Sequence, residues 1–343
     1  MDIKLLPTIQ EWRNLYAMAV KFKEIEPWNW MWDSDIFGVQ NPYTGEIGYC
    51  CITGRLGVHF GLVVYLGTEG LDMCWETQAE EKQPEDFELI DLQKCLTASF
   101  EDRRYLEKPD LDLIKVLGLR FKGHNAWPLF RNYCPGYIPW FLSKEEVEYL
   151  TLALEQAIHV AVRFKEDEDL LTAQQEGIFF VRIPEITTDN IITWKDGWLK
   201  PAPLETKHVV LIDVPEIHLE RIRKSAVHQN QIWEADSFPI PTFIKDRERP
   251  YYLYGCVFID KNSSFVLAAE MIKPQEYHNK FVGLLLKAME EFGIIPKQIF
   301  VKKEEAFELL QPITSRLNIE LKIVKRLPEL ERFKSELIKS LSR

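Results

Sequence analysis

The sequence lacks the patterns that would assign it to a membrane or to an oxidising compartment. No apolar run reaches the roughly 18 to 20 residues that span a bilayer. The first twenty residues carry four charged side chains, so we do not expect a signal peptide. The six cysteines show no CxxC spacing, which argues against a zinc site and against a disulfide framework. These absences predict a cytoplasmic protein with reduced thiols.

Signatures of common catalytic machinery are missing as well. The sequence has no GxSxG elbow and no cysteine in a recognisable catalytic context. The glycines between Gly48 and Gly67 lack the Gly-Lys-Ser/Thr ending of a phosphate-binding loop, and turn or packing positions explain them better. The sequence motifs therefore indicate no particular reaction, and we expect no cofactor.

Charge is unevenly distributed along the 343 residues, whose formal net charge is -11. In residues 1–171, 29 acidic residues outnumber 17 basic ones, whereas in residues 272–343 the 14 basic residues outnumber 10 acidic ones. An acidic surface repels phosphates, so broad binding of nucleic acid to the first half is not expected. The expected partner is a protein or a small molecule, and neither a nucleic acid nor a membrane.

Aromatic residues are concentrated in the first half, where seven of the ten tryptophans precede residue 141. Trp28, Trp30 and Trp32 alternate, so we expect them to share one face of an extended segment. They could pack in the core or form an aromatic ligand cage. Residues 126–140 combine aromatics with three prolines and predict a rigid irregular loop. The candidate binding residues of the two segments are Trp28, Trp30, Trp127, Arg131 and Trp140.

Periodicity and composition divide the chain into two predicted domains. Residues 8–25 and the run after Ser143 have helical spacing and capping residues, while two strands are expected on either side of a turn at Gly54–Gly57. The charged run 166–177 is the best linker candidate. We therefore expect an aromatic-rich α+β domain over residues 1–165, a linker over 166–177, and an α/β domain over 178–343.

The C-terminal part has the most regular pattern. In residues 251–271, two apolar runs flank the turn sequence KNSS, which predicts a hairpin. The region before it, residues 228–250, contains three prolines and is expected to form a loose connection. The predicted elements that remain are strands at 178–183 and 208–214, helices at 216–226, 275–292, 304–317 and 328–341, and strands at 298–301 and 319–324. Residues 251–343 thus read ββαβαβα.

This order of elements resembles a ribonuclease H-like fold, which has three strands before its first helix; here only two and the ambiguous stretch 232–244 are visible. The whole chain also resembles uncharacterised bacterial proteins with paired domains of unknown function, and that resemblance implies no established activity. The residues that carry this second resemblance are Gly54, Gly57, Phe60-Gly61-Leu62, Tyr65, Gly67, Trp127-Pro128, Pro135-Gly136, Pro139-Trp140, Pro296, Ile299, Val301, Leu327-Pro328 and Leu330.

The ribonuclease H-like resemblance implies a particular set of metal ligands. An active member needs carboxylates from its first strand, its first helix, the end of its fourth strand and its last helix, gathered on two metal ions. Asp260, Glu290 and Glu331 are candidates for three of these places. After the predicted strand 298–301, however, the chain has Lys302 and Lys303, and an ammonium group cannot bind magnesium.

A second possible metal cluster is equally weak. His208, Asp213 and His218 flank one predicted strand, but positions five apart on a strand point to opposite faces. We therefore expect no metal site. The leading hypothesis is a non-catalytic binding or interaction protein with a degenerate ribonuclease H-like domain. The alternative is a metal-dependent hydrolase or nuclease that uses Asp260 and Glu290, and a third possibility is a small-molecule pocket lined by tryptophans.

Overall fold

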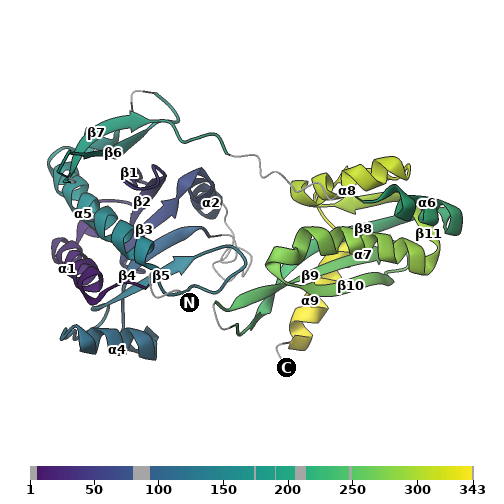
Figure 1. Ribbon diagram of the computed structural model, residues 1–343, viewed down its shortest axis with the longest axis horizontal. Helices are drawn as coiled ribbons and strands as arrows, with labels where there is room; N and C mark the ends of the chain where they lie inside the picture. Colours follow the sequence, from purple (N-terminus) through teal and green to yellow (C-terminus); the bar gives the residue numbers. More distant parts are fainter. Residues whose placement is uncertain are drawn as a thin grey trace. The chain divides into compact units, whose positions relative to one another are not determined.

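The computed structural model describes residues 6–79, 93–173, 175–189, 191–204, 214–246 and 249–341. The chain forms two compact units (Figure 1). Unit 1 comprises Met1–Pro135 and Pro139–Leu204, and unit 2 comprises Gly136–Ile138 and Glu205–Arg343. The boundary therefore follows Leu204, not the charged run 166–177. The reason is that strand β6 after this run pairs in parallel with β1 and so belongs to the sheet of unit 1.

In its described residues, unit 1 contains a seven-stranded sheet in the order β5-β4-β3-β2-β1-β6-β7. Neighbouring strands are antiparallel apart from the parallel pair β1 and β6. The expected strand pair around Gly54–Gly57 is confirmed as β2 and β3. The strands of unit 1 are β1 (Phe37–Gln40), β2 (Ile47–Thr53), β3 (Gly61–Leu66), β4 (Cys95–Glu101), β5 (Trp127–Tyr133), β6 (Phe179–Ile186) and β7 (Ile192–Leu199).

Two long helices, α1 (Ile9–Ile25) and α5 (Lys144–Glu166), pack side by side against this sheet (Figure 1). Both begin where the sequence predicted, because Thr8 and Ser143 each form a capping box with the glutamate three residues later. The core between helices and sheet contains fully buried Leu15, Phe22 and Leu154. The helices of unit 1 are α1 (Ile9–Ile25), α2 (Gly67–Ala79), α4 (Lys108–Val116) and α5 (Lys144–Glu166), with short 3-10 turns at Pro27–Asn29, Arg103–Tyr105 and Glu168–Leu171.

Both aromatic segments differ from the sequence prediction. The first forms a 3-10 helix at Pro27–Asn29, so its tryptophans do not share a face: Trp28 is buried, whereas Trp32 is 46% exposed. The second contains a regular strand, β5, paired with β4. Pro128 is compatible with that strand because β5 is at the edge of the sheet, where a missing N–H breaks no ladder.

Unit 2 contains, in its described residues, a five-stranded sheet in the order β10-β9-β8-β11-β12. Strands β8, β9 and β10 are antiparallel neighbours, while β11 is parallel to both β8 and β12. The elements of unit 2 are α6 (Glu216–Ser225), β8 (Val227–Ile244), β9 (Tyr251–Asp260), β10 (Val266–Ile272), α7 (Tyr277–Phe292), β11 (Ile294–Val301), α8 (Glu304–Arg316), β12 (Glu320–Ile323) and α9 (Pro328–Leu341), with a short 3-10 turn at Pro274–Glu276.

The predicted hairpin and the helices and strands after it are confirmed, but residues 228–250 are not a loose connection. They contribute most of β8, which lies in the middle of the sheet. Its prolines, Pro239 and Pro241, coincide with a shift of register against β9 between Pro239 and Phe243. An irregularity of this kind accommodates residues that have no N–H to donate. The strand predicted at 208–214 lies largely outside the described residues.

The sheet of unit 2 has an apolar core on each face. Trp233 and Ala235 of β8 face the core formed with α6, α7 and α8. Phe238 and Ile240 of the same strand face a smaller core, where Leu330 of α9 packs. Within the described residues, no helix of either unit is long and apolar enough to cross a bilayer.

Candidate functional site

The end of β11 brings a lysine close to an aspartate of the neighbouring strand β8 in unit 2. β11 pairs with β8 up to Phe300 opposite Glu234, so the residues after β11 lie beside the middle of the longer strand. There the ammonium group of Lys303 donates a hydrogen bond to the carbonyl oxygen of Ser237. It also lies 3.9 Å from Oδ1 of Asp236. A cationic side chain therefore lies at the C-terminal end of β11.

Polar groups from α7 and α8 complete this neighbourhood. His278 Nε2 lies 3.0 Å from Glu305 Oε1. The hydroxyl of Tyr277 is buried near Ser237 and Glu305, and it forms no hydrogen bond of good geometry with any described residue. Burial, reinforced by the negative charge of Glu305, raises the pKa of Tyr277 far above its ordinary value. Tyr277 is thus a neutral hydroxyl at physiological pH.

Glu234 is a second carboxylate on β8, two residues before Asp236, and it binds the start of α9. Its side chain is fully buried, and Oε2 accepts the backbone N–H groups of Glu329 and Leu330 at 3.0 and 3.1 Å. Both N–H groups belong to the first turn of α9, where a helix has unsatisfied donors. Burial raises the pKa of Glu234, and the two hydrogen bonds partly oppose this shift. Glu234 therefore caps α9.

The three predicted catalytic carboxylates have separate surroundings. Asp260 ends β9, which is the second strand of the sheet and not the first, because β8 precedes it. Its Oδ2 accepts the Ser263 hydroxyl at 2.5 Å and so stabilises the hairpin turn. Glu290 is exposed on α7, and Glu331 on α9 pairs with Arg326 at 2.7 Å. Among the described residues, no three His, Cys, Asp or Glu side chains are grouped so that they could hold a metal ion.

The candidate tryptophans are placed in different environments. Trp28 packs in the core against Phe60, with ring centroids 5.2 Å apart. Trp30 donates its indole N–H to the carbonyl of Ala161 at 2.9 Å and is partly buried. Trp140 is also partly buried and stacks edge-on with Phe141. Trp28 therefore contributes to packing, Trp30 is anchored to the backbone of α5, and Trp140 packs against its neighbour in the chain.

Arg131 forms a buried bidentate ion pair in unit 1. Its side chain on β5 is 7% exposed, and two of its nitrogens bind the carboxylate of Asp110 on α4 at 2.9 and 2.7 Å. This bidentate geometry is the strongest that an arginine and a carboxylate form. The pair connects α4 to the edge strand β5. A groove lies between α4 and the chain that follows it.

That groove contains the one remaining predicted binding residue, Trp127, and it has a volume of about 850 Å³. Four of the side chains along it are cationic and one, Asp112, is anionic. Sequence reasoning missed the groove, because averaging over the acidic first half hides the local excess of six basic over three acidic residues between 103 and 122. The groove is lined by Arg103, Lys108, Leu111, Asp112, Ile114, Lys115, Gly118, Leu119, Arg120, Phe121 and Trp127.

Matches to family models divide the chain into two parts that correspond approximately to its two units. Residues 12–182 match the family model of a domain of unknown function, DUF7309, and residues 218–338 match that of another, DUF6930. The chain thus pairs two domains of unknown function. Among curated proteins, no sequence matches it.

Solved structures of two retroviral assemblies are similar to part of the chain. The HTLV-2 integrase catalytic core domain in complex with magnesium, in its trimeric form, is 21% identical, with a TM-score of 0.25 over 32% of this chain and 68% of that chain. A simian T-cell lymphotropic virus intasome in complex with PP2A regulatory subunit B56 gamma is 24% identical, with a TM-score of 0.25 over 34% of this chain and 43% of that chain.

Proposed function

We propose that the chain is a non-catalytic binding protein whose unit 2 is a degenerate ribonuclease H-like domain. The order of elements supports this assignment, because three antiparallel strands precede α7 and two parallel strands follow it. In this arrangement β8 is the first strand and β11 the fourth. The position that requires a carboxylate after the fourth strand therefore falls at Lys302 and Lys303.

The contact between Lys303 and Asp236 is the observation that carries the proposal. A divalent ion placed beside Asp236 would face the ammonium group of Lys303, which lies 3.9 Å from the carboxylate oxygen. Like charges at such separations repel strongly where water is partly excluded. Lys303 has no lone pair to offer a hard cation, which requires oxygen ligands. Lys303 thus places a positive charge where a metal site would need a negatively charged oxygen ligand.

The binding role is supported by the groove of unit 1. Beside α4 this groove presents cationic and aromatic groups to solvent. Charged groups together with flat apolar side chains are what a ligand site requires.

The proposal can be tested by reversing the charge of the lysine. We expect the natural protein to bind Mn²⁺ weakly and to cleave neither DNA, RNA nor nucleotides. In Lys303→Glu a second carboxylate joins Asp236, so Mn²⁺ affinity measured by calorimetry should rise about tenfold or more. Lys302→Glu is the matched control, because Lys302 is its exposed neighbour and should leave the affinity unchanged.

Turnover by the natural protein would contradict the proposal. If metal-dependent cleavage were observed and were abolished by Asp260→Asn or Glu290→Gln, the alternative hypothesis of a metal-dependent hydrolase would replace it. If Asp236→Asn abolished the cleavage instead, unit 2 would be an enzyme with a different ligand set.

A further inference from the structure

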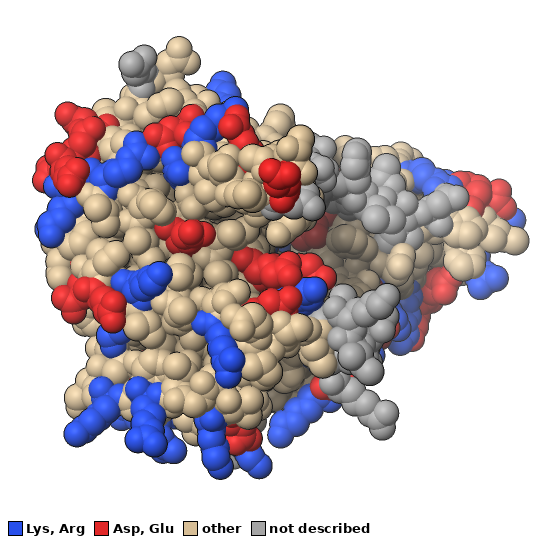
Figure 2. Space-filling model, turned by 60° about the vertical axis from the view of Figure 1, so that its left-hand side comes forward, with Lys and Arg blue, Asp and Glu red and all other residues tan. Residues whose placement is uncertain are grey.

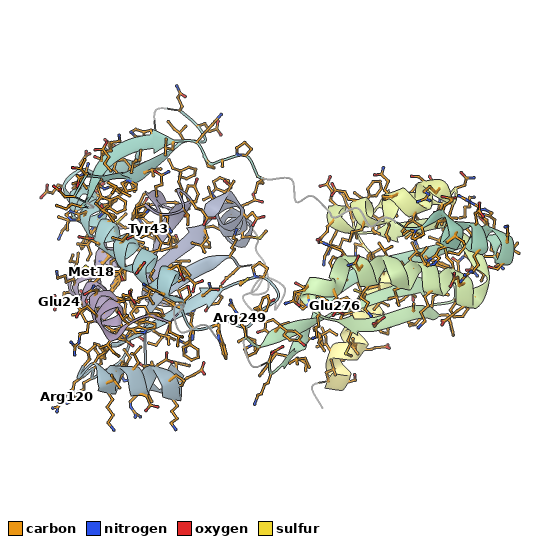
Figure 3. All side chains as sticks on the ribbon, in the orientation of Figure 1. Met18, Glu24, Tyr43, Arg120, Arg249 and Glu276 are labelled. Atoms are coloured by element: carbon orange, nitrogen blue, oxygen red, sulfur yellow. The ribbon has the colours of Figure 1, made fainter. Side chains whose placement is uncertain are left out.

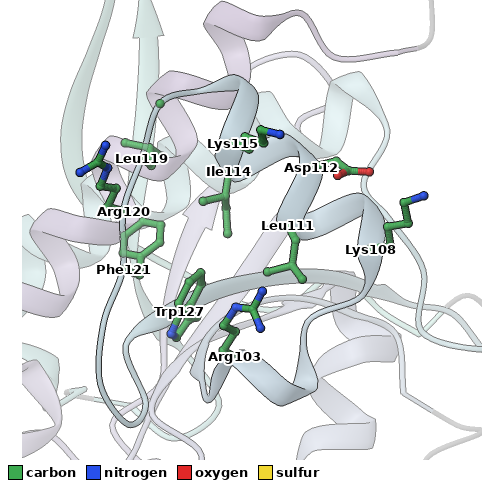
Figure 4. A pocket seen from close by; sticks show the side chains of 11 residues that line it. Arg103, Lys108, Leu111, Asp112, Ile114, Lys115, Leu119, Arg120, Phe121 and Trp127 are labelled. Carbon is green, nitrogen blue, oxygen red and sulfur yellow. The ribbon is translucent and has the colours of Figure 1, made fainter.

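We propose that the groove of unit 1 binds a mononucleotide, with its phosphates at the cationic rim and its base on the aromatic floor. This inference rests on the binding role proposed above and names the ligand class. The groove is bounded by α4, by the loop that follows it and by the start of β5 (Figure 4).

The floor of the groove suits a flat apolar ring. Leu111 and Ile114 project from α4 towards Phe121 and Trp127, as Figure 4 shows. The rings of Phe121 and Trp127 meet edge to face, with centroids 5.8 Å apart and planes at 62°. The guanidinium carbon of Arg103 lies 5.9 Å from the Trp127 centroid. Aromatic and guanidinium planes together are the usual stacking partners of a nucleobase.

The rim carries a net positive charge, because Asp112 is the one acidic side chain among four cationic ones along the groove. Lys108, Lys115 and Arg120 are exposed around the groove, and no acidic group among the described residues pairs with them. Figure 3 shows Arg120 at the end of unit 1 occupied by α4. Flexible lysines and a forked guanidinium can reach several phosphate oxygens at once. An anion with more than one negative charge fits this rim better than a monoanion does.

The surroundings of the groove limit the size of the ligand. Figure 2 shows Lys and Arg side chains along the lower edge of the visible face, at the height of α4 in Figure 1, with Asp and Glu concentrated above them. In the described residues 6–79 and 93–171, 22 acidic residues outnumber 15 basic ones. A long polyanion would leave the groove and meet this negative surface, whereas one nucleotide would not. Its molecular volume also fits the 850 Å³ available.

Binding can be measured with ADP that carries an N-methylanthraniloyl label on its ribose. Its anisotropy should rise on addition of the full-length protein at low salt and fall again as salt is added. Lys115→Glu and Arg120→Glu should each weaken binding by about tenfold or more, the effect of losing one charge-assisted hydrogen bond. Lys200→Glu is the control, because this exposed lysine follows β7 at the opposite edge of the sheet from β5.

Competition identifies what the groove recognises. We expect unlabelled AMP to displace the probe at lower concentration than inorganic phosphate does, because the base adds stacking. A single-stranded oligonucleotide of about ten residues, or an acidic peptide, that competed more strongly than AMP would overturn the assignment to one nucleotide. The absence of saturable binding, or equal binding by Lys115→Glu and Lys200→Glu, would overturn the site.

The same experiment separates this inference from the proposed function. Chromatography of the bound nucleotide after incubation shows whether it has been hydrolysed. Hydrolysis would refute the non-catalytic role and leave the binding site standing. An intact nucleotide that does not bind would refute the binding site and leave the non-catalytic role standing.

Discussion

The two units each contain a cation beside an aspartate, and the two pairs differ in almost every physical respect. Arg131 of unit 1 is buried and makes two short hydrogen bonds to Asp110. Lys303 of unit 2 is partly exposed and lies 3.9 Å from Asp236. A complete, buried pair holds structure together, because each charge depends on the other. A loose pair contributes little stability, so its charge is available to determine what the site can bind.

The first prediction tests the buried pair and has the largest expected effect. Arg131→Ala should lower the free energy of unfolding by about 3 to 5 kcal/mol, because it leaves the Asp110 carboxylate buried and unpaired. Urea denaturation followed by tryptophan fluorescence measures this effect selectively, because nine of the ten tryptophans belong to unit 1.

A second arginine of unit 1 provides the control for that measurement. Arg163 also binds an aspartate through two nitrogens, at 3.1 and 2.7 Å from Asp196, but both side chains are 40% exposed. Arg163→Ala should therefore cost less than about 1 kcal/mol. Equal losses in the two variants would show that burial does not distinguish these pairs.

The second prediction concerns Glu234, whose buried carboxylate has backbone donors in place of a cation. Glu234→Ala should destabilise the attachment of α9 by about 2 kcal/mol, because two N–H groups lose a charged acceptor. Hydrogen exchange of peptides from residues 328–341 should accelerate, while exchange in α5 stays unchanged. Unchanged protection of α9 would show that its apolar contacts alone hold it in place.

The pH dependence of the same residue has a definite sign. Burial raises the pKa of Glu234 in the folded state above its value of 4.5 in the unfolded chain. Its stabilising contribution is therefore fully present below pH 4.5 and decreases as pH rises through the folded-state pKa. Relative to Glu234→Gln, which does not titrate, the natural protein should lose stability as pH rises above 4.5. A difference that stays constant with pH would contradict the raised pKa.

The success of sequence reasoning depended on how local the signal was. The helix after Ser143 and the α7 terminus at Gly293 were predictable, because capping and left-handed backbone (φ 63°) are encoded within a few residues. The strand β8 was missed because its prolines resemble breakers, and only pairing with β9 and β11 shows that they can be accommodated. Prolines also explain why strand β5 was not predicted.

The candidate site was predictable only in part, for the same reason. The cation after β11 could be located from the order of elements, but its partner could not, because Asp236 lies on the strand that was missed. The groove of unit 1 combines a 3-10 turn, a helix, a loop and a strand. Its charge becomes visible only when these segments are brought together.

The last prediction has the smallest expected effect and completes the comparison of the two pairs. Lys303→Met keeps the aliphatic part of the side chain and removes its charge, so the fold of unit 2 should lose less than about 1 kcal/mol in thermal or urea unfolding. Asp236 would keep the Ser237 N–H, which it accepts at 2.8 Å. A loss as large as that of Arg131→Ala would show that Lys303 is a structural cation, and the contrast between the two units would then disappear.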